Sequence, residues 1–246
     1  MAKIDEAYHR LKADILAARL APDTPLAVSM LTRRTGLGWT PLREALSRLE
    51  AEGLVVSSPN RGYRVAPVSF DSLRDLQVAR QTVEDALLVR SVETGDTDWE
   101  GRLVAAHHAL SRAPVPRPDR ATEDLVLWET RHDAFHAALL SAGDSATLTR
   151  FHGQISDQLR RHHRHMLVDP ALQSAMDATA RTTFDRLLSR MLGLAHHTRL
   201  MDAALARDLE GARALLREHI GFSSAVYAFL RELGAGEATA AAPARR

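Results

Sequence analysis

The chain has 246 residues, of which 45% are hydrophobic and 26% are charged. This composition is typical of globular proteins and excludes a disordered or collagen-like chain, and the length allows one large domain or two ordinary ones. The chain contains no cysteine, which excludes disulfide bonds, thiolate nucleophiles and cysteine-ligated zinc, and which fits a cytoplasmic protein. No signal peptide or membrane-spanning stretch is evident, so we expect a soluble protein without a membrane partner.

The formal net charge is +1, but the two parts of the chain differ in sign. Residues 1–68 carry a net charge of +3, whereas the remaining residues carry −2. This asymmetry is too small to identify a nucleic-acid-binding domain without a sequence motif.

Residues 1–68 show helical spacing of apolar side chains, followed by a strand pattern. Gly36 closes the second predicted helix, and either Gly38 or Thr40 caps the third. The predicted helices cover about residues 4–16, 29–35 and 41–53, and the predicted strands cover residues 54–56 and 63–65. Two short helices followed by a hairpin predict a winged helix-turn-helix domain.

The segment GWTPLREALSRLEAEGL (38–54), followed by RGYRV (61–65), resembles the DNA-binding domain of the GntR family of bacterial regulators. The resemblance implies that a helix N-terminus enters the major groove of a double-stranded operator, while the wing approaches the backbone or the minor groove. By this resemblance, Arg43 is the main base-reading candidate, and Gly62 lets the wing approach DNA closely. Further candidates for DNA contact are Thr40, Trp39, Arg33, Arg34, Arg48, Arg61 and Arg64.

The sequence departs from the family pattern at two places. The family often has Ser or Thr followed by Arg where this chain has Gly38 and Trp39, and often Arg where it has Ser29. Trp39 is equally compatible with a DNA contact and with a packing role. The operator sequence of other family members therefore does not transfer to this chain.

From residue 69 onwards the pattern predicts helices only, which gives a mostly α protein. The predicted helices cover residues 70–94, 98–112, 121–142, 145–166, 173–204 and 208–233. The proline-containing stretch 113–119 predicts a loop, and residues 235–246 predict a disordered tail. The expected domains are a winged helix over 1–68 and an antiparallel helical bundle over 69–234.

A winged helix followed by such a bundle resembles the FadR branch of the GntR family, whose ligand-binding domain is called FCD. The run WETRHDAFH (128–136) and the residues Trp99, Glu100 and 105–108 are also similar to the subgroup of carbon-starvation-induced regulators. The resemblance implies a homodimer that reads a near-palindromic operator in response to a small molecule.

Four histidines lie on the apolar faces of three predicted helices. His132 and His136 are one turn apart, and His197 and His219 lie on the last two helices. A single buried histidine is usually a core residue, but four that converge favour a metal site. The metal-binding FCD pattern has a carboxylate at the first position, where this chain has His132, so Asp133 is the alternative fourth ligand. Imidazole ligands favour a divalent ion such as zinc or nickel.

Four neutral imidazoles leave the double charge of such an ion uncompensated, so the site is expected to attract a small carboxylate effector. Arg80 lies in an apolar stripe and could bind this anion, or it could pair with Glu84 one turn later. Arg131, Arg160 and Arg161 are further effector-binding candidates. The histidines at 162, 163 and 165 read instead as a basic solvated face.

The expected function is therefore a repressor that a carboxylate releases from DNA. The alternative is a helical-bundle metalloenzyme with an accessory N-terminal domain. The sequence contains no nucleophile motif, HExxH, phosphate-binding glycine loop or EF-hand, so we do not expect an enzyme.

Overall fold

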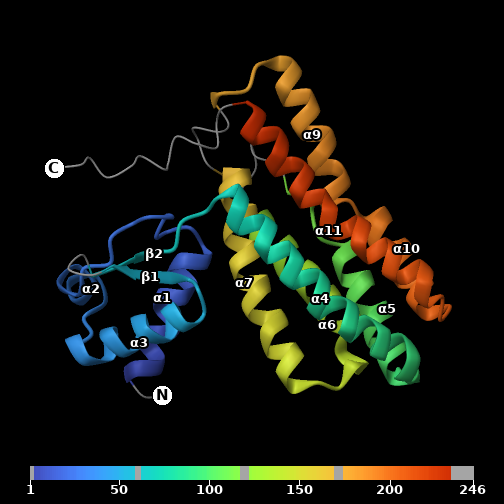
Figure 1. Ribbon diagram of the computed structural model, residues 1–246, viewed down its shortest axis with the longest axis horizontal. Helices are drawn as coiled ribbons and strands as arrows, with labels where there is room; N and C mark the ends of the chain where they lie inside the picture. Colours follow the sequence, from blue (N-terminus) through green and yellow to red (C-terminus); the bar gives the residue numbers. More distant parts are fainter. Residues whose placement is uncertain (1–2, 59–61, 117–121, 169–173, 234–246) are drawn as a thin grey trace. The chain divides into compact units, whose positions relative to one another are not determined.

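The computed structural model describes residues 3–58, 62–116, 122–168 and 174–233 (Figure 1). These residues are mostly helical, with one two-stranded sheet, as the sequence predicted. They form two compact units, of which the first contains the residues up to Ser69 together with Asp157–His165. The second unit begins at Phe70 and contains the other described residues.

The first unit is a winged helix-turn-helix. Its helices are α1 (Lys3–Leu16), α2 (Val28–Thr35) and α3 (Trp39–Ala51), and its wing pairs β1 (Val55–Ser58) with β2 (Gly62–Val65). The strands are antiparallel, with Val55 opposite Val65. The core is formed by leucines that are fully buried, among them Leu11, Leu31, Leu42, Leu46, Leu49 and Leu54.

Glycines set the boundaries that orient α3. Gly36 ends α2 in the left-handed region at a φ of 74°, where its N–H donates to the carbonyl of Thr32. Gly38 is the N-cap of α3, which decides between the two candidates that the sequence left open. Gly62 opens β2 at a φ of 70°, a conformation that favours glycine. The positive φ therefore explains why a glycine stands at this position of the wing.

The second unit is an all-helical bundle. Helix α11 packs against α4, α9 and α10, while α5 packs against α6 and α10. Trp99, Phe135 and Phe184 are fully buried in its core. Its elements are α4 (Phe70–Thr94), α5 (Thr97–Ser111), α6 (Thr122–Leu139), the 3₁₀ turn η1 (Ser141–Gly143), α7 (Ala146–Val168), α9 (Ala178–Leu192), α10 (Leu194–Leu205) and α11 (Leu209–Glu232).

Helix α7 contributes to both units. Its segment 157–165 belongs to the first unit, where Asp157 and Glu52 each lie 2.8 Å from the Lys12 ammonium group. The Gln158 side chain donates a hydrogen bond of 3.0 Å to the carbonyl of Glu52. The sequence did not predict this division, because the amphipathic pattern of α7 continues without interruption across it.

The predicted single helix over 173–204 is wrong. The described part of it is divided at Gly193, whose ψ of 143° is extended rather than helical, into α9 and α10. A Cβ atom on Gly193 would lie 2.5 Å from the carbonyl oxygen of Ser189, so a larger residue would not fit this bend. The described residues do not include residue 173, where that predicted helix begins, Arg61 in the wing, or the predicted tail 235–246.

No helix among the described residues is both long and apolar enough to cross a membrane.

Candidate metal centre and DNA-reading surface

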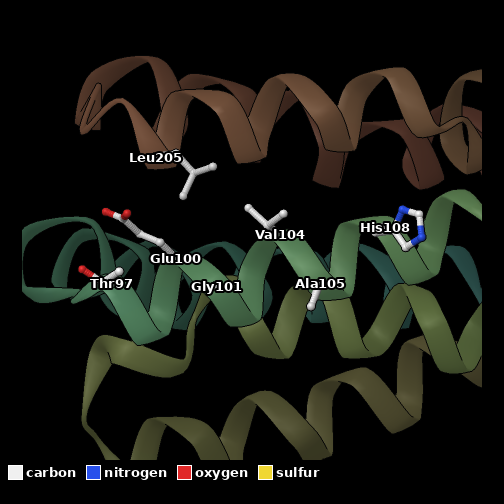
Figure 2. Close-up of a pocket in the computed structure, with 7 residues that line it drawn as sticks. All are labelled: Thr97, Glu100, Gly101, Val104, Ala105, His108 and Leu205. Atoms are coloured by element: carbon white, nitrogen blue, oxygen red, sulfur yellow. The ribbon is translucent and has the colours of Figure 1, made fainter.

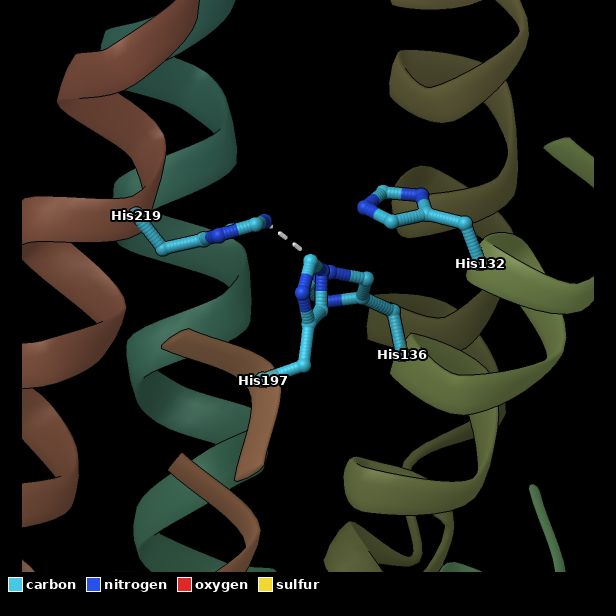
Figure 3. Close-up of side chains that lie close together, drawn as sticks. All are labelled: His132, His136, His197 and His219. Carbon is cyan, nitrogen blue, oxygen red and sulfur yellow. Dashed lines mark hydrogen bonds between the residues drawn. The ribbon is translucent and has the colours of Figure 1, made fainter. Parts of the chain in front are cut away.

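The four predicted histidines meet inside the helical unit (Figure 3). His132 and His136 come from α6, His197 from α10 and His219 from α11. One ring nitrogen from each lies within 4.8 Å of those of the others. His132 is partly buried, and the other three are buried. Helix α6 and the consecutive helices α10 and α11 thus bring four imidazoles to one point.

One pair of ring nitrogens has a spacing that suits two ligands of the same metal ion. Nε2 of His136 lies 3.1 Å from Nε2 of His219. Two nitrogens that bind one ion at about 2.1 Å are roughly 3 to 3.4 Å apart for ligand angles between a right angle and the tetrahedral angle. The same distance also fits a hydrogen bond between one N–H and one lone pair. Both arrangements require at least one lone pair at this point.

The break at Gly193 determines which nitrogen of His197 faces the cluster. Nδ1 of His197 lies 2.9 Å from the carbonyl oxygen of Gly193, so Nδ1 carries the proton and donates it there. Nε2 consequently holds a lone pair, and it has no hydrogen-bond partner in the described part of the chain. A backbone carbonyl that fixes the tautomer in this way is typical of histidines that bind metals.

Burial keeps three of these imidazoles neutral. Burial, together with the neighbouring His132 and Arg80, lowers the pKa of His197 to about 3, although its hydrogen bond to the carbonyl of Gly193 acts in the opposite direction. Burial also holds the pKa of His136 and His219 well below the ordinary value, again with contributions from neighbouring imidazoles and Arg80. Because metal binding needs neutral imidazole, the cluster is ready to bind a cation near neutral pH.

Aromatic contacts hold two of the rings. Trp128 stacks on His132 with ring centroids 4.5 Å apart, and His196 stacks on His219 at 5.5 Å. The alternative ligand Asp133 is not part of the cluster, and its Oδ1 lies 3.7 Å from Nδ1 of His132. The geometry therefore groups His132, rather than Asp133, with the other three histidines.

Arg80 pairs with Glu84, which is one of the two alternatives that the sequence left open. Its Nε donates to Oε1 of Glu84 at 2.8 Å, and both side chains are buried. Its charge also acts on three of the cluster histidines. Burial alone would raise the pKa of Glu84, but Arg80 and His152 outweigh this effect and lower it to about 2. Glu84 is therefore ionised.

The start of α3 forms an exposed surface with polar and aromatic groups. Trp39, its first residue, is 59% exposed, and Thr40 and Arg43 are also exposed. Of the predicted DNA-contacting arginines in the described residues, Arg33 and Arg43 form no hydrogen bond or ion pair. The others that are described have acidic partners: Arg34 pairs with Asp14, Arg48 with Asp5 and Arg64 with Asp23.

Family models match both units. A model of bacterial regulatory proteins of the gntR family matches residues 3–65, and a model of the FCD domain matches residues 75–222. The chain belongs to the GntR family. It is a DNA-binding transcriptional regulator with an FCD domain, and its family members and relatives are regulators rather than enzymes, as predicted.

Two relatives of this GntR regulator align over most of the chain. It is 38% identical to the HTH-type transcriptional regulator BphR of Paraburkholderia xenovorans strain LB400 over 165 residues. This alignment covers 65% of this chain and 66% of BphR, so the chain spans just under two thirds of the length of BphR. It is 37% identical to the HTH-type transcriptional repressor GlaR of Escherichia coli strain K12 over 157 residues, 64% of this chain and 70% of GlaR.

Solved structures share the fold of the regulator. A GntR transcriptional regulator from Rhodococcus sp. RHA1 has a TM-score of 0.64 at 21% identity, covering 92% of this chain and 97% of that chain. McbR/YncC of E. coli has a TM-score of 0.63 at 20% identity, covering 94% and 98%. At these identities the likeness concerns the fold alone.

The other arginines predicted for the effector lie on α6 and α7. Arg160 and Arg161 belong to the first unit, where the Arg161 guanidinium donates to the carbonyl of Ala66. Burial lowers the pKa of Arg161 to about 10. Arg131 is exposed on α6, beside a surface depression of about 390 Å³.

The predicted solvated face on α7 is also wrong. His162 is 2% exposed and its Nδ1 lies 2.9 Å from the carbonyl of Gln158. Arg164 is buried as well. The alternation of arginine and histidine resembled a charged surface, but Arg161, His162 and Arg164 are buried within the first unit, while His163 and His165 are partly buried.

A second depression, of about 580 Å³, lies between α5 and α10 (Figure 2). Its lining is mainly apolar and includes Val104, Ala105 and Leu205, with His108 at one end. None of the four clustered histidines lines it, so it is separate from the candidate metal centre.

Arg34 and its neighbour Arg33 are expected to behave differently on substitution. Arg34 lies 3.0 Å from the buried carboxylate of Asp14, so Arg34→Ala should lower the melting temperature of the protein. Arg33→Ala should leave stability unchanged and reduce the slope of log affinity for DNA against log salt by about one. Thermal unfolding and DNA titrations at several salt concentrations measure both effects. Equal loss of stability in the two variants would contradict this division.

Proposed function

We propose that this protein is a metabolite-responsive repressor of the FadR branch, in which a divalent metal ion and a small carboxylate bind inside the FCD domain. The observation that carries the proposal is the convergence of four imidazole nitrogens within 4.8 Å in that domain. We retain residues 1–68 as the DNA-binding domain and 69–234 as the effector domain, with the α7 segment described above packed in the first unit.

His132, His136, His197 and His219 would hold the ion. The donor set fits, because the Nε2 lone pair of His197 is buried without a partner among the described residues. Neutral nitrogen ligands favour zinc or nickel over magnesium or calcium. When bound, such an ion supplies a positive charge that carboxylate oxygens can coordinate.

Arg80 supports an anionic effector. It is 6% exposed, and its one hydrogen bond to a described residue uses Nε, which leaves both Nη groups available as donors. A guanidinium with two free parallel donors binds a carboxylate well. The buried carboxylates among the described residues of the second unit are Glu84 and Glu129, and their two negative charges do not balance the guanidinium and a divalent ion together, so an anion would be electrostatically favoured.

The DNA-reading role falls to the N-terminus of α3 and the wing. Arg43 would read a guanine edge, with Thr40, Trp39 and Arg33 beside it, and the wing at Gly62 would contact the backbone or minor groove. Arg34, Arg48, Arg61 and Arg64 would contact phosphates less directly. A homodimer would place two such surfaces on a near-palindromic operator in the cytoplasm of a bacterium.

Release from DNA would follow from unequal affinity. If the carboxylate binds one conformation of the FCD domain more tightly, its presence shifts the population toward that conformation. Repression is supported by the relative GlaR, which is named a transcriptional repressor. The effector-bound conformation would then hold the two DNA-reading surfaces at a spacing that fits the operator less well.

A single experiment tests the effector proposal. The protein loaded with zinc or nickel is screened against small mono- and dicarboxylates by thermal unfolding, and each acid is then added to the protein–operator complex. An acid at about 100 times its dissociation constant should stabilise the protein by about 2.7 kcal/mol and release it from DNA. Stabilisation by none of the acids would contradict the effector proposal.

A further inference from the structure

Helix α4 presents three polar side chains on its buried face. Gln77, Arg80 and Glu84 are spaced i, i+3 and i+7, which places them along one side of a helix. They are 7%, 6% and 1% exposed. A row of buried polar groups is unfavourable unless each group has a partner, so the partners of these three are informative.

Two acceptor oxygens in this row have no protein partner. The amide nitrogen of Gln77 donates to Oγ of Ser223, whose own hydroxyl donates to the carbonyl of Ile220, so the amide orientation is fixed. The Oε1 of Gln77 then has no hydrogen-bond partner among the described residues. Oε1 of Glu84 is bound by Arg80 and His152, but its Oε2 is likewise unpaired.

This row runs beside the histidine cluster. Ser223, the partner of Gln77, lies one turn after His219 on α11, and α11 packs along α4. The charge of Arg80, between Gln77 and Glu84, acts on His136, His197 and His219. A molecule bound at the cluster and at Arg80 would therefore lie next to both unpaired oxygens.

We propose that the effector is a hydroxylated carboxylate, whose hydroxyl hydrogens donate to Oε1 of Gln77 and Oε2 of Glu84. The inference rests on the proposed function and adds a class of effector to it. Both oxygens can only accept hydrogen bonds, so they select a ligand with donors. A protonated amine would also donate, but it would add positive charge beside Arg80 and a divalent ion. Hydroxyl groups supply the donors without this cost.

The test compares acids that differ by one hydroxyl. Zinc-loaded full-length protein is titrated with succinate and 2-hydroxysuccinate, and with butyrate and 3-hydroxybutyrate, by calorimetry. The hydroxylated member should bind at least about 10-fold more tightly in one pair or both, because an unmet buried acceptor penalises the acid that lacks the donor. Equal affinity within both pairs would overturn the inference.

A substitution separates Gln77 from chelation of the ion by a hydroxyl. Gln77→Met keeps the side-chain length and removes the acceptor, so the preference should fall at least about threefold while the zinc content stays the same. The control Gln154→Met makes the same change on α7 and should retain the preference. An unchanged preference in Gln77→Met would show that water or protein satisfies Gln77.

Different results would contradict the proposed effector function and the proposed class of effector. If no acid binds the zinc-loaded wild-type protein, the proposed effector function fails. If acids bind but their hydroxyl groups do not matter, only the hydroxylated class is wrong. The wild-type comparison needs no variant, so equal affinities within both pairs overturn the hydroxylated class even where Gln77→Met does not fold.

Discussion

Replacing Arg43 with alanine is expected to lower the affinity for the operator about 30-fold or more, since each bidentate contact to guanine contributes about 1 to 3 kcal/mol and a dimer makes two. Arg43 is exposed on α3 and has no acidic partner in the described structure, so its loss should not affect folding. Binding to unrelated DNA should change little, because that binding depends on phosphate contacts.

The operator for this measurement can be selected from random duplexes with the wild-type protein. Affinity is then measured for wild type, Arg43→Ala and the control Arg102→Ala, whose arginine is exposed on α5 in the second unit and should leave operator affinity unchanged. Thermal unfolding and metal content should be the same for all three proteins. Operator affinity retained by Arg43→Ala would contradict the assignment of this helix to base reading.

His136→Ala should empty the metal site. His136 is buried, and its Nε2 lies 3.1 Å from that of His219, so no other described side chain can replace it without rearrangement. Removing it leaves three imidazoles and a cavity, which lowers both metal affinity and core packing. Elemental analysis of the purified protein should find stoichiometric metal in wild type and none in the variant.

Two controls distinguish lost ligation from lost folding. His108→Ala removes an exposed histidine on α5 and should leave the metal content unchanged. Circular dichroism should report the same helix content for His136→Ala and wild type, and added zinc should raise the melting temperature of wild type only. An unchanged metal content in a folded His136→Ala protein would contradict the assignment of the four histidines as a metal centre.

Local patterns predicted most of the fold. The helical spacing of apolar residues located the bundle helices, and α4 begins and ends where the pattern predicted. Gly36 closed the second predicted helix, and the structure ends α2 at this glycine with a positive φ. The histidines stood out because they occupy inward positions on three separate helices, a feature that periodicity alone reveals.

Features that depend on contacts between distant segments were not predictable. The break at Gly193 leaves the periodicity of its flanks intact, so the sequence read one helix where there are two. The burial of Asp14 against Arg34, and of Arg161 against the carbonyl of Ala66, depends on tertiary packing. A charged residue at an inward position of the first helix was the one available signal for Asp14.

The bend at Gly193 makes the histidine cluster depend on a residue that has no side chain to contribute. Its carbonyl orients one imidazole, and a continuous helix would turn that ring by a different angle about the axis. A single added methyl group at this position would therefore disturb the centre more than many changes to the residues around it. The lone pair that His197 offers to the cluster therefore depends on a peptide carbonyl four residues earlier in the chain.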